Sequence, residues 1–170
     1  EPALPVIDRS RIRQVIDEAN DGFLSPDDIS ILFEAANIPI ATQKTVIHVD
    51  EALAAAEVMG YPLVMKVVGP VHKSEHGGVK LNIQSAEELI ATYDDLMMIE
   101  GSTGVLMQQQ LKGTEVFIGA SREEQFGHVI LCGLGGIFIE VLKDITSAIA
   151  PVGKEEAISM IRHLKSYPII

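Results

Sequence analysis

The densest group of residues that could do chemistry lies in the segment KVVGPVHKSEHGGVKLN, residues 66–82. Lys66 stands in an apolar strand pattern and precedes a polar turn that ends in the glycine pair Gly77 and Gly78. Adjacent glycines allow backbone conformations that point amide groups at an anion, and a strand lysine adds a positive charge. The segment therefore predicts a phosphate-binding turn. Spacing alone leaves an ordinary hairpin with a solvated tip as the alternative.

Two histidines, His72 and His76, lie in this turn. Their spacing of four residues would suit a zinc site on a helix, but Pro70 and the glycine pair disfavour a helix there. An imidazole on a polar loop is partly unprotonated at neutral pH, so its nitrogen can accept a phosphoryl group. Phosphoryl transfer is thus the favoured interpretation of the turn, and a zinc site is the alternative.

Composition restricts the classes of function. The chain has 13 basic and 24 acidic residues, a net charge of -11, which disfavours partners such as nucleic acids and acidic membranes. A single cysteine, Cys132, excludes an internal disulfide, favours a reducing cytoplasmic compartment, and is expected in the core because it ends the run VILC. No apolar run approaches the ~20 residues of a membrane span, so we expect a soluble protein. The chain starts without methionine and ends on an apolar run, so we expect a fragment.

Periodicity and turn signals predict an α+β protein. The Ser25-Pro26 pair and the Ser85 capping box should each start a helix. The pattern changes around residues 101–104, which predicts a linker helix in 1–24, a first lobe in 25–103 and a second lobe in 104–170, with a cleft between the lobes. We expect helices near 7–20, 25–36, 51–59, 85–98 and 155–164, and strands near 38–47, 61–68, 79–83, 105–111, 115–120 and 128–132. Short turns between the last three strands favour antiparallel pairing.

Two blocks carry a specific resemblance: YPLVMKVVGPVHKSEHGGVKLNI and GVLMQQQLKGTEVFIGASREEQFGHVILCGLGGIFIEVLKDITSAIAP. They resemble the ADP-forming acyl-CoA synthetases, also called acetate:CoA ligases. In that family a strand lysine precedes a loop of the type His-Lys-Ser/Thr-Asp/Glu-x-Gly-Gly-Val. The similarity covers about Ser25 to Ile170. It implies the ATP-grasp fold, in which a nucleotide is held between two α+β lobes that have antiparallel sheets. The second lobe would be truncated.

The resemblance also implies roles for individual residues. Lys66 would contact nucleotide phosphates, with Gly77 and Gly78 supplying loop amides, and His72 would carry phosphate on a swinging loop. The segment Met107, Gln108, Gln109, Gln110 and Leu111 would hold adenine through its backbone, although Gln109 replaces an acidic residue frequent in such hinges. Glu115 would accept hydrogen bonds from ribose hydroxyls. Glu123, Glu140 and Asp144 are candidates for metal or loop contacts.

The implied reaction converts acyl-CoA, ADP and phosphate to acid, CoA and ATP, with magnesium as a cofactor of the complete enzyme. CoA-binding and ligase domains, fused or as a separate subunit, would be the partners. The acidic residue-x-Asn-Pro segment that holds magnesium in such domains does not follow Ile170, so the metal ligands stay unassigned and the fragment alone is expected to be inactive. Two alternatives are an inactive regulatory module fused to a protein acetyltransferase, and a conventional ATP-grasp carboxylate ligase, which needs no loop histidine.

Overall fold

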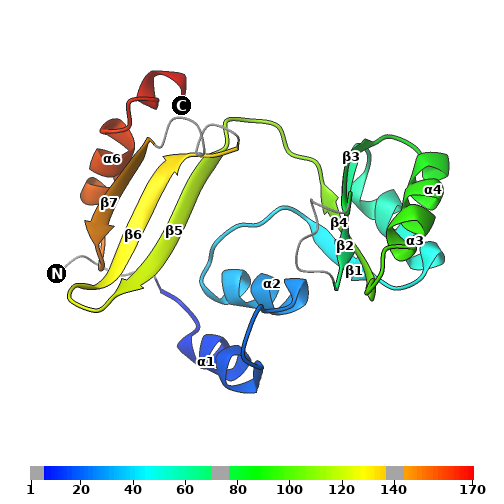
Figure 1. Ribbon diagram of the computed structural model, residues 1–170, viewed down its shortest axis with the longest axis horizontal. Coiled ribbons are helices and arrows are strands. Elements are labelled where there is room, and N and C mark those ends of the chain that lie inside the picture. The colour runs from blue at the N-terminus through cyan, green and yellow to red at the C-terminus, as the bar shows by residue number, and fades with distance from the viewer. Residues whose placement is uncertain (1–5, 70–76, 137–143) are drawn as a thin grey trace. The chain divides into compact units, whose positions relative to one another are not determined.

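The computed structural model describes residues 6–69, 77–136 and 144–170, and it divides into two compact units, Val6–Leu111 and Lys112–Ile170 (Figure 1). The first unit contains α1 (Arg9–Glu18), α2 (Pro26–Ala35), β1 (Gln43–Val46), α3 (Val49–Met59), β2 (Leu63–Val68), β3 (Val79–Ile83), α4 (Ala86–Met97) and β4 (Gly104–Gln109). The second contains β5 (Val116–Glu123), β6 (Gly127–Leu134), β7 (Ile145–Ile149), α6 (Lys154–Arg162) and the short 3-10 helix η1 (Tyr167–Ile169).

Local capping explains where the helices of the first unit begin. The hydroxyl of Ser25 accepts a hydrogen bond from the Asp28 amide (3.1 Å) at the start of α2, and the hydroxyl of Ser85 does the same for the Glu88 amide (3.2 Å) in α4. Both starts agree with the sequence signals. The helix expected within residues 1–24 is α1, and it packs on α2 through an ion pair between Arg11 and Glu34 (2.9 Å).

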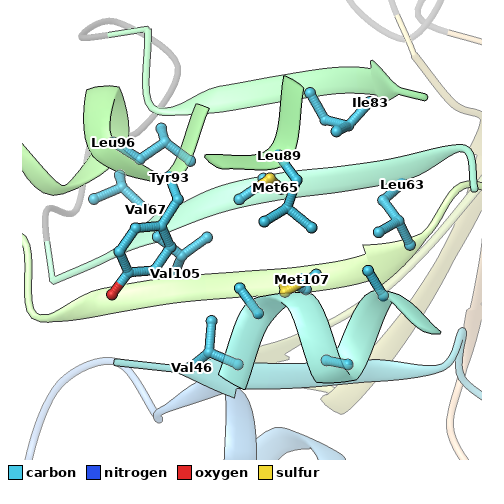
Figure 2. Packing of buried hydrophobic residues seen from close by; sticks show 13 residues of the cluster. Val46, Leu63, Met65, Val67, Ile83, Leu89, Tyr93, Leu96, Val105 and Met107 are labelled. Carbon is cyan, nitrogen blue, oxygen red and sulfur yellow. The ribbon is translucent and has the colours of Figure 1, made fainter. Parts of the chain in front are cut away.

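The first unit is built on a four-stranded antiparallel sheet in the order β1-β4-β2-β3. Helices α3 and α4 cover one face, and Figure 2 shows the side chains of α4 packed against the strands. Alternate residues of β2 and β4 fill this core, with Met65 opposite Met107 in the register. The largest fully buried side chains are Leu63, Met65, Leu89, Leu96, Met107, Val46, Val67 and Val105. Burial of each side chain contributes about 1.5–3 kcal/mol to folding. The packed face therefore holds the sheet rigid for residues on the opposite face, which α3 and α4 do not cover.

Strand β4 corrects the lobe boundary expected from the sequence. Residues 104–111 were grouped with the second lobe, but β4 lies inside the first sheet, between β1 and β2, and the division falls between Leu111 and Lys112. Burial decides this placement, because Val105 and Met107 point into the first core. A change in turn pattern along the chain carries no information about which sheet a strand joins.

The second unit has a three-stranded antiparallel sheet in the order β5-β6-β7, with α6 on one face. Cys132 is buried there with Met160 and Leu164, as expected, and burial raises the pKa of its thiol. Strand β7 was not predicted, although its sequence ITSAI is rich in β-branched residues. The α+β class and the antiparallel pairing are confirmed. Within the described ranges, no helix has the length and apolar character needed to cross a membrane.

Candidate functional site

Lys66 lies in a pocket on the face of the first sheet that α3 and α4 do not cover. The alternation of β2 sends Met65 and Val67 into the core and Lys66 to the opposite face. The pocket has a volume of ≈ 680 Å³, and its lining includes Lys66, Leu106 and residues Pro26 and Ile29 of α2. A cationic group beside an apolar wall suits an organic phosphate, which is the role predicted for this lysine.

A chain of side-chain hydrogen bonds holds α2 next to this pocket. The side-chain Nε2 of Gln108 donates a hydrogen bond to Gln43 Oε1, and Gln43 Nε2 donates to Ser30 Oγ (2.6 Å). Ser30 Oγ in turn donates to the backbone carbonyl of Pro26 (2.8 Å). Gln108 therefore has a side-chain role in addition to the backbone role predicted for it. Gln43 and Ser30 were missed, because no local motif marks residues that meet only across a sheet and a helix.

The described chain is anchored on both sides of residues 70–76. Gly69 has φ +118, and a Cβ atom there would lie 2.1 Å from the carbonyl oxygen of Gly101. The amide of Thr103 donates to the Val68 carbonyl (2.8 Å), and the amide of Val67 donates to the carbonyl of Gly78 (2.8 Å). Both ends of the segment are thus fixed to the end of β2. His72 and His76 lie outside the described residues, and so does Glu140.

The segment predicted to hold adenine, residues 107–110, is largely engaged inside the first unit. Met107 and Gln108 pair with β1 and β2 on both edges of β4, so the sheet uses their backbone groups, and the Met107 side chain is in the core. The amide of Gln109 donates to the Thr42 carbonyl (2.9 Å). Gln110 Oε1 accepts from the amide of Asn82 (2.6 Å), which has φ 61. Adenine recognition by this segment stays a prediction.

Glu115 lines a separate pocket of ≈ 530 Å³ within the second unit. The amide of Gly135 donates to the Glu115 carbonyl (2.7 Å), and a Cβ at Gly136 would lie 2.8 Å from Glu115 Oε2. Gly136 also has φ +63, a conformation that favours glycine, where this carboxylate approaches the end of β6. Ile169 lines the same pocket and was not predicted, because nothing near it in the sequence marks a site.

Glu123 and Asp144, two of the three candidates for metal or loop contacts, do not come together. Glu123 pairs with Gly127 at one end of β6, whereas Asp144 directly precedes Ile145, which pairs with Gly133 near the other end. At ~3.3 Å per strand residue these ends are about 20 Å apart. Among residues 6–69, 77–136 and 144–170, no group of three or more histidine, cysteine or acidic side chains is placed to hold a metal ion.

Asp144 instead binds backbone amides. Its carboxylate accepts hydrogen bonds from the amides of Lys165 (3.0 Å) and Ser166 (2.7 Å). The Ser166 side chain and these two amides hold the pKa of the Asp144 carboxyl below its usual range. This carboxylate is thus a partner of the turn after α6, which is the loop-contact role among those considered for it.

Comparisons with known proteins assign the chain to a family. A family model of the ATP-grasp domain matches residues 15–170. The chain belongs to the ATP-grasp family. Within it, the chain is 37% identical over 174 residues to the beta subunit of acetate–CoA ligase (ADP-forming) I from Pyrococcus furiosus, covering 95% of this chain and 75% of that subunit. It is 38% identical to the Archaeoglobus fulgidus acetate–CoA ligase (ADP-forming) I, of which it spans only 26%.

Solved ATP-grasp structures agree. The acetyl-coenzyme A synthetase 1 of Ca. Korarchaeum cryptofilum, in complex with coenzyme A and Ca-AMPCP, has a TM-score of 0.83 at 30% identity, covering 95% of this chain and 75% of that one. A second structure of that enzyme, with coenzyme A and Mg-AMPPCP, has a TM-score of 0.76 at 30% identity and covers 95% and 73%. In it a phosphohistidine segment points towards the nucleotide-binding site. The resemblance to ADP-forming acyl-CoA synthetases and the ATP-grasp fold are confirmed.

Proposed function

We propose that this chain is the nucleotide-binding, phosphohistidine-carrying part of an ADP-forming acyl-CoA synthetase. The complete reaction converts acyl-CoA, ADP and phosphate to acid, CoA and ATP. The relatives described above are ligases, and they lend no support to a regulatory module fused to an acetyltransferase. A conventional ATP-grasp carboxylate ligase would need no loop histidine, so the His-Lys-Ser-Glu-His-Gly-Gly loop favours the acyl-CoA synthetase.

One observation carries the proposal. The segment that contains His72 leaves and rejoins the sheet at the end of β2, the strand that also presents Lys66 to its pocket. A phosphoryl group on His72 would need a nearby cation, because phosphoryl transfer depends on positioning and charge neutralisation more than on covalent help. Lys66 is fixed on the rigid strand and can supply that charge.

His72 would work in two balanced steps. A ring nitrogen of His72 forms a bond to phosphorus while the bond from phosphorus to a partner domain's histidine breaks. That bond to His72 then breaks as a β-phosphate oxygen of ADP attacks the phosphorus, which yields ATP and the free imidazole. The partner would be the CoA-binding and ligase domains, on the same chain or on a second subunit, since no residue described in this chain is assigned to CoA or to the acid.

We expect Lys66 and Glu115 to contact the nucleotide, and the magnesium ligands stay unassigned. Lys66 would hold phosphates, and Glu115 with the adjoining glycine backbone of Gly135 and Gly136 would hold the nucleoside. The close approach of Glu115 to Gly136 supports this role for Glu115. Since Gly136 has no side chain, it leaves space for hydroxyl groups to donate hydrogen bonds to the carboxylate. No step of the mechanism depends on a metal position.

Phosphate trapping tests the proposal. The complete enzyme, with magnesium and ATP labelled in its γ-phosphate, should acquire an acid-labile label on His72, and its His72→Ala variant should lose ATP formation from acyl-CoA. His76→Ala is the matched control, because it removes the other histidine of the same turn, and it should keep the label and most of the turnover. Near-normal turnover of His72→Ala, or label on His76, would refute the carrier assignment.

A further inference from the structure

Asp144 connects the sheet of the second unit to the apolar wall of the Glu115 pocket. Both of its carboxylate oxygens are used, one by the amide of Lys165 (3.0 Å) and one by the amide of Ser166 (2.7 Å). These two residues directly precede η1, which contains Ile169. Ile169 lines the pocket together with Glu115. The hydrogen bonds from Asp144 to the residues just before η1 therefore help to position Ile169 at the pocket.

Besides the bonds to Asp144, the burial of Leu164 and Ser166 orients the turn after α6. Its internal bonds, such as Ile169 to Ser166 (2.9 Å) and Tyr167 to Leu164 (3.1 Å), run between neighbours and keep its shape, but they do not tie it to the sheet. Ile169 is 63% exposed, so core packing does not hold its side chain. Bonds from a carboxylate to backbone amides are stronger than neutral ones, which makes Asp144 an effective anchor.

The pocket has two chemically different sides. Glu115 offers hydrogen-bond acceptors, and Ile169 and Leu134 offer apolar surface. None of the described residues that line it is a lysine or an arginine, so a phosphate would be repelled by Glu115 without compensation. A nucleoside matches both sides, since its ribose hydroxyls donate hydrogen bonds and its base is a flat, largely apolar ring.

Building on the proposed nucleotide binding, we propose that Asp144 is a positioning residue for nucleoside binding: it holds the Lys165 and Ser166 amides so that Ile169 stands against the base while Glu115 accepts from the ribose. Asp144 would not touch the nucleotide. Its effect on nucleotide affinity would depend on Ile169 alone. A general loss of folding would lower the affinity whether or not Ile169 is present.

The test is a double-mutant cycle on the 170-residue chain, with ADP and adenosine as probes and binding followed by NMR titration, which reads millimolar constants. Ile169→Ala should weaken ADP binding by about threefold to tenfold, as expected for one apolar contact in a pocket, and Asp144→Asn should weaken it similarly. The double variant should bind no more weakly than Ile169→Ala alone, because contacts in series are not additive. Adenosine should show the same pattern, since the contacts are to the nucleoside.

A matched control is Asp8→Asn, which removes the charge of a comparable carboxylate that accepts from a backbone amide, that of Arg11 (3.0 Å), in the first unit. It should leave ADP affinity unchanged. Additive losses in the Asp144→Asn, Ile169→Ala double variant would mean that Asp144 only supports folding, and this would overturn the inference, as would unchanged affinity in Asp144→Asn. If the wild-type chain binds neither ADP nor adenosine, or if Glu115→Ala binds them as well as the wild type does, the nucleotide role of this pocket fails instead, and the inference fails with it.

Discussion

Gly69, beside the Lys66 pocket, is a position where adding a single methyl group should strongly destabilise the first unit. A Cβ there would lie 2.1 Å from the carbonyl oxygen and 3.2 Å from the carbonyl carbon of Gly101. Ordinary carbon–oxygen contacts are about 3.3–3.6 Å, so one of the two backbones must shift by roughly 1 Å. The hydrogen bond from Thr103 to Val68 ties the same two segments together and opposes that shift. Gly69 also has φ +118, which disfavours any residue with a side chain.

We expect Gly69→Ala to lower the free energy of unfolding of the first unit by about 2–5 kcal/mol, from ~1–2 kcal/mol of backbone strain and ~1–3 kcal/mol of overpacking. Urea unfolding followed by hydrogen exchange in β2 and β4 measures this in the first unit alone. Gly22→Ala is the matched control, because Gly22 has φ +122 but nothing within 4 Å of its Cβ position. It should show only the backbone strain. Equal losses in the two variants would refute the close contact between Gly69 and Gly101.

Two further outcomes follow from burial and charge. Met107→Ala should cost about 2–5 kcal/mol in urea unfolding of the first unit, because Met107 is 0% exposed at the centre of the core; a loss below about 1 kcal/mol would contradict that placement. The lowered pKa of Asp144 means that its carboxylate stabilises the folded state above the ordinary aspartate pKa, and that this contribution disappears as pH falls through the lowered value. The stability gap between wild type and Asp144→Asn should therefore be widest near neutral pH and close in acid. Thermal melts from pH 7 to 2.5 would show this, and a gap independent of pH would exclude an ionised Asp144 as its source.

The two pockets show how differently the site residues could be predicted. Lys66 was predicted from the polar turn that follows it and Glu115 from the family resemblance, and each lines a pocket in its own unit. Gln43 and Ile169 were missed, since Gln43 bonds to Gln108 across a sheet and Ile169 reaches the pocket that Glu115 lines only through the packing of α6 on β6 and β7. Their importance depends on neighbours that are distant along the chain.

Elements with local causes were determined by the sequence itself. Helices α2 and α4 begin where Ser25 and Ser85 can bond to amides three residues ahead, and such short-range bonds do not depend on the rest of the fold. The turn glycine Gly77 likewise has the positive φ of 66 that a glycine pair permits.

Only the tertiary structure decided the membership of β4 and the role of Asp144. An apolar strand can fill either of two sheets, and burial of Val105 and Met107 in the first core settles the choice. Asp144 could have been a metal ligand by its type, but its partners are amides 21 and 22 residues away, brought to it by the packing of α6. A hydrogen bond between near neighbours can be predicted from the spacing of residues along the chain. Burial and long-range pairing depend on how all the elements of a unit pack together, so they cannot be predicted from local sequence.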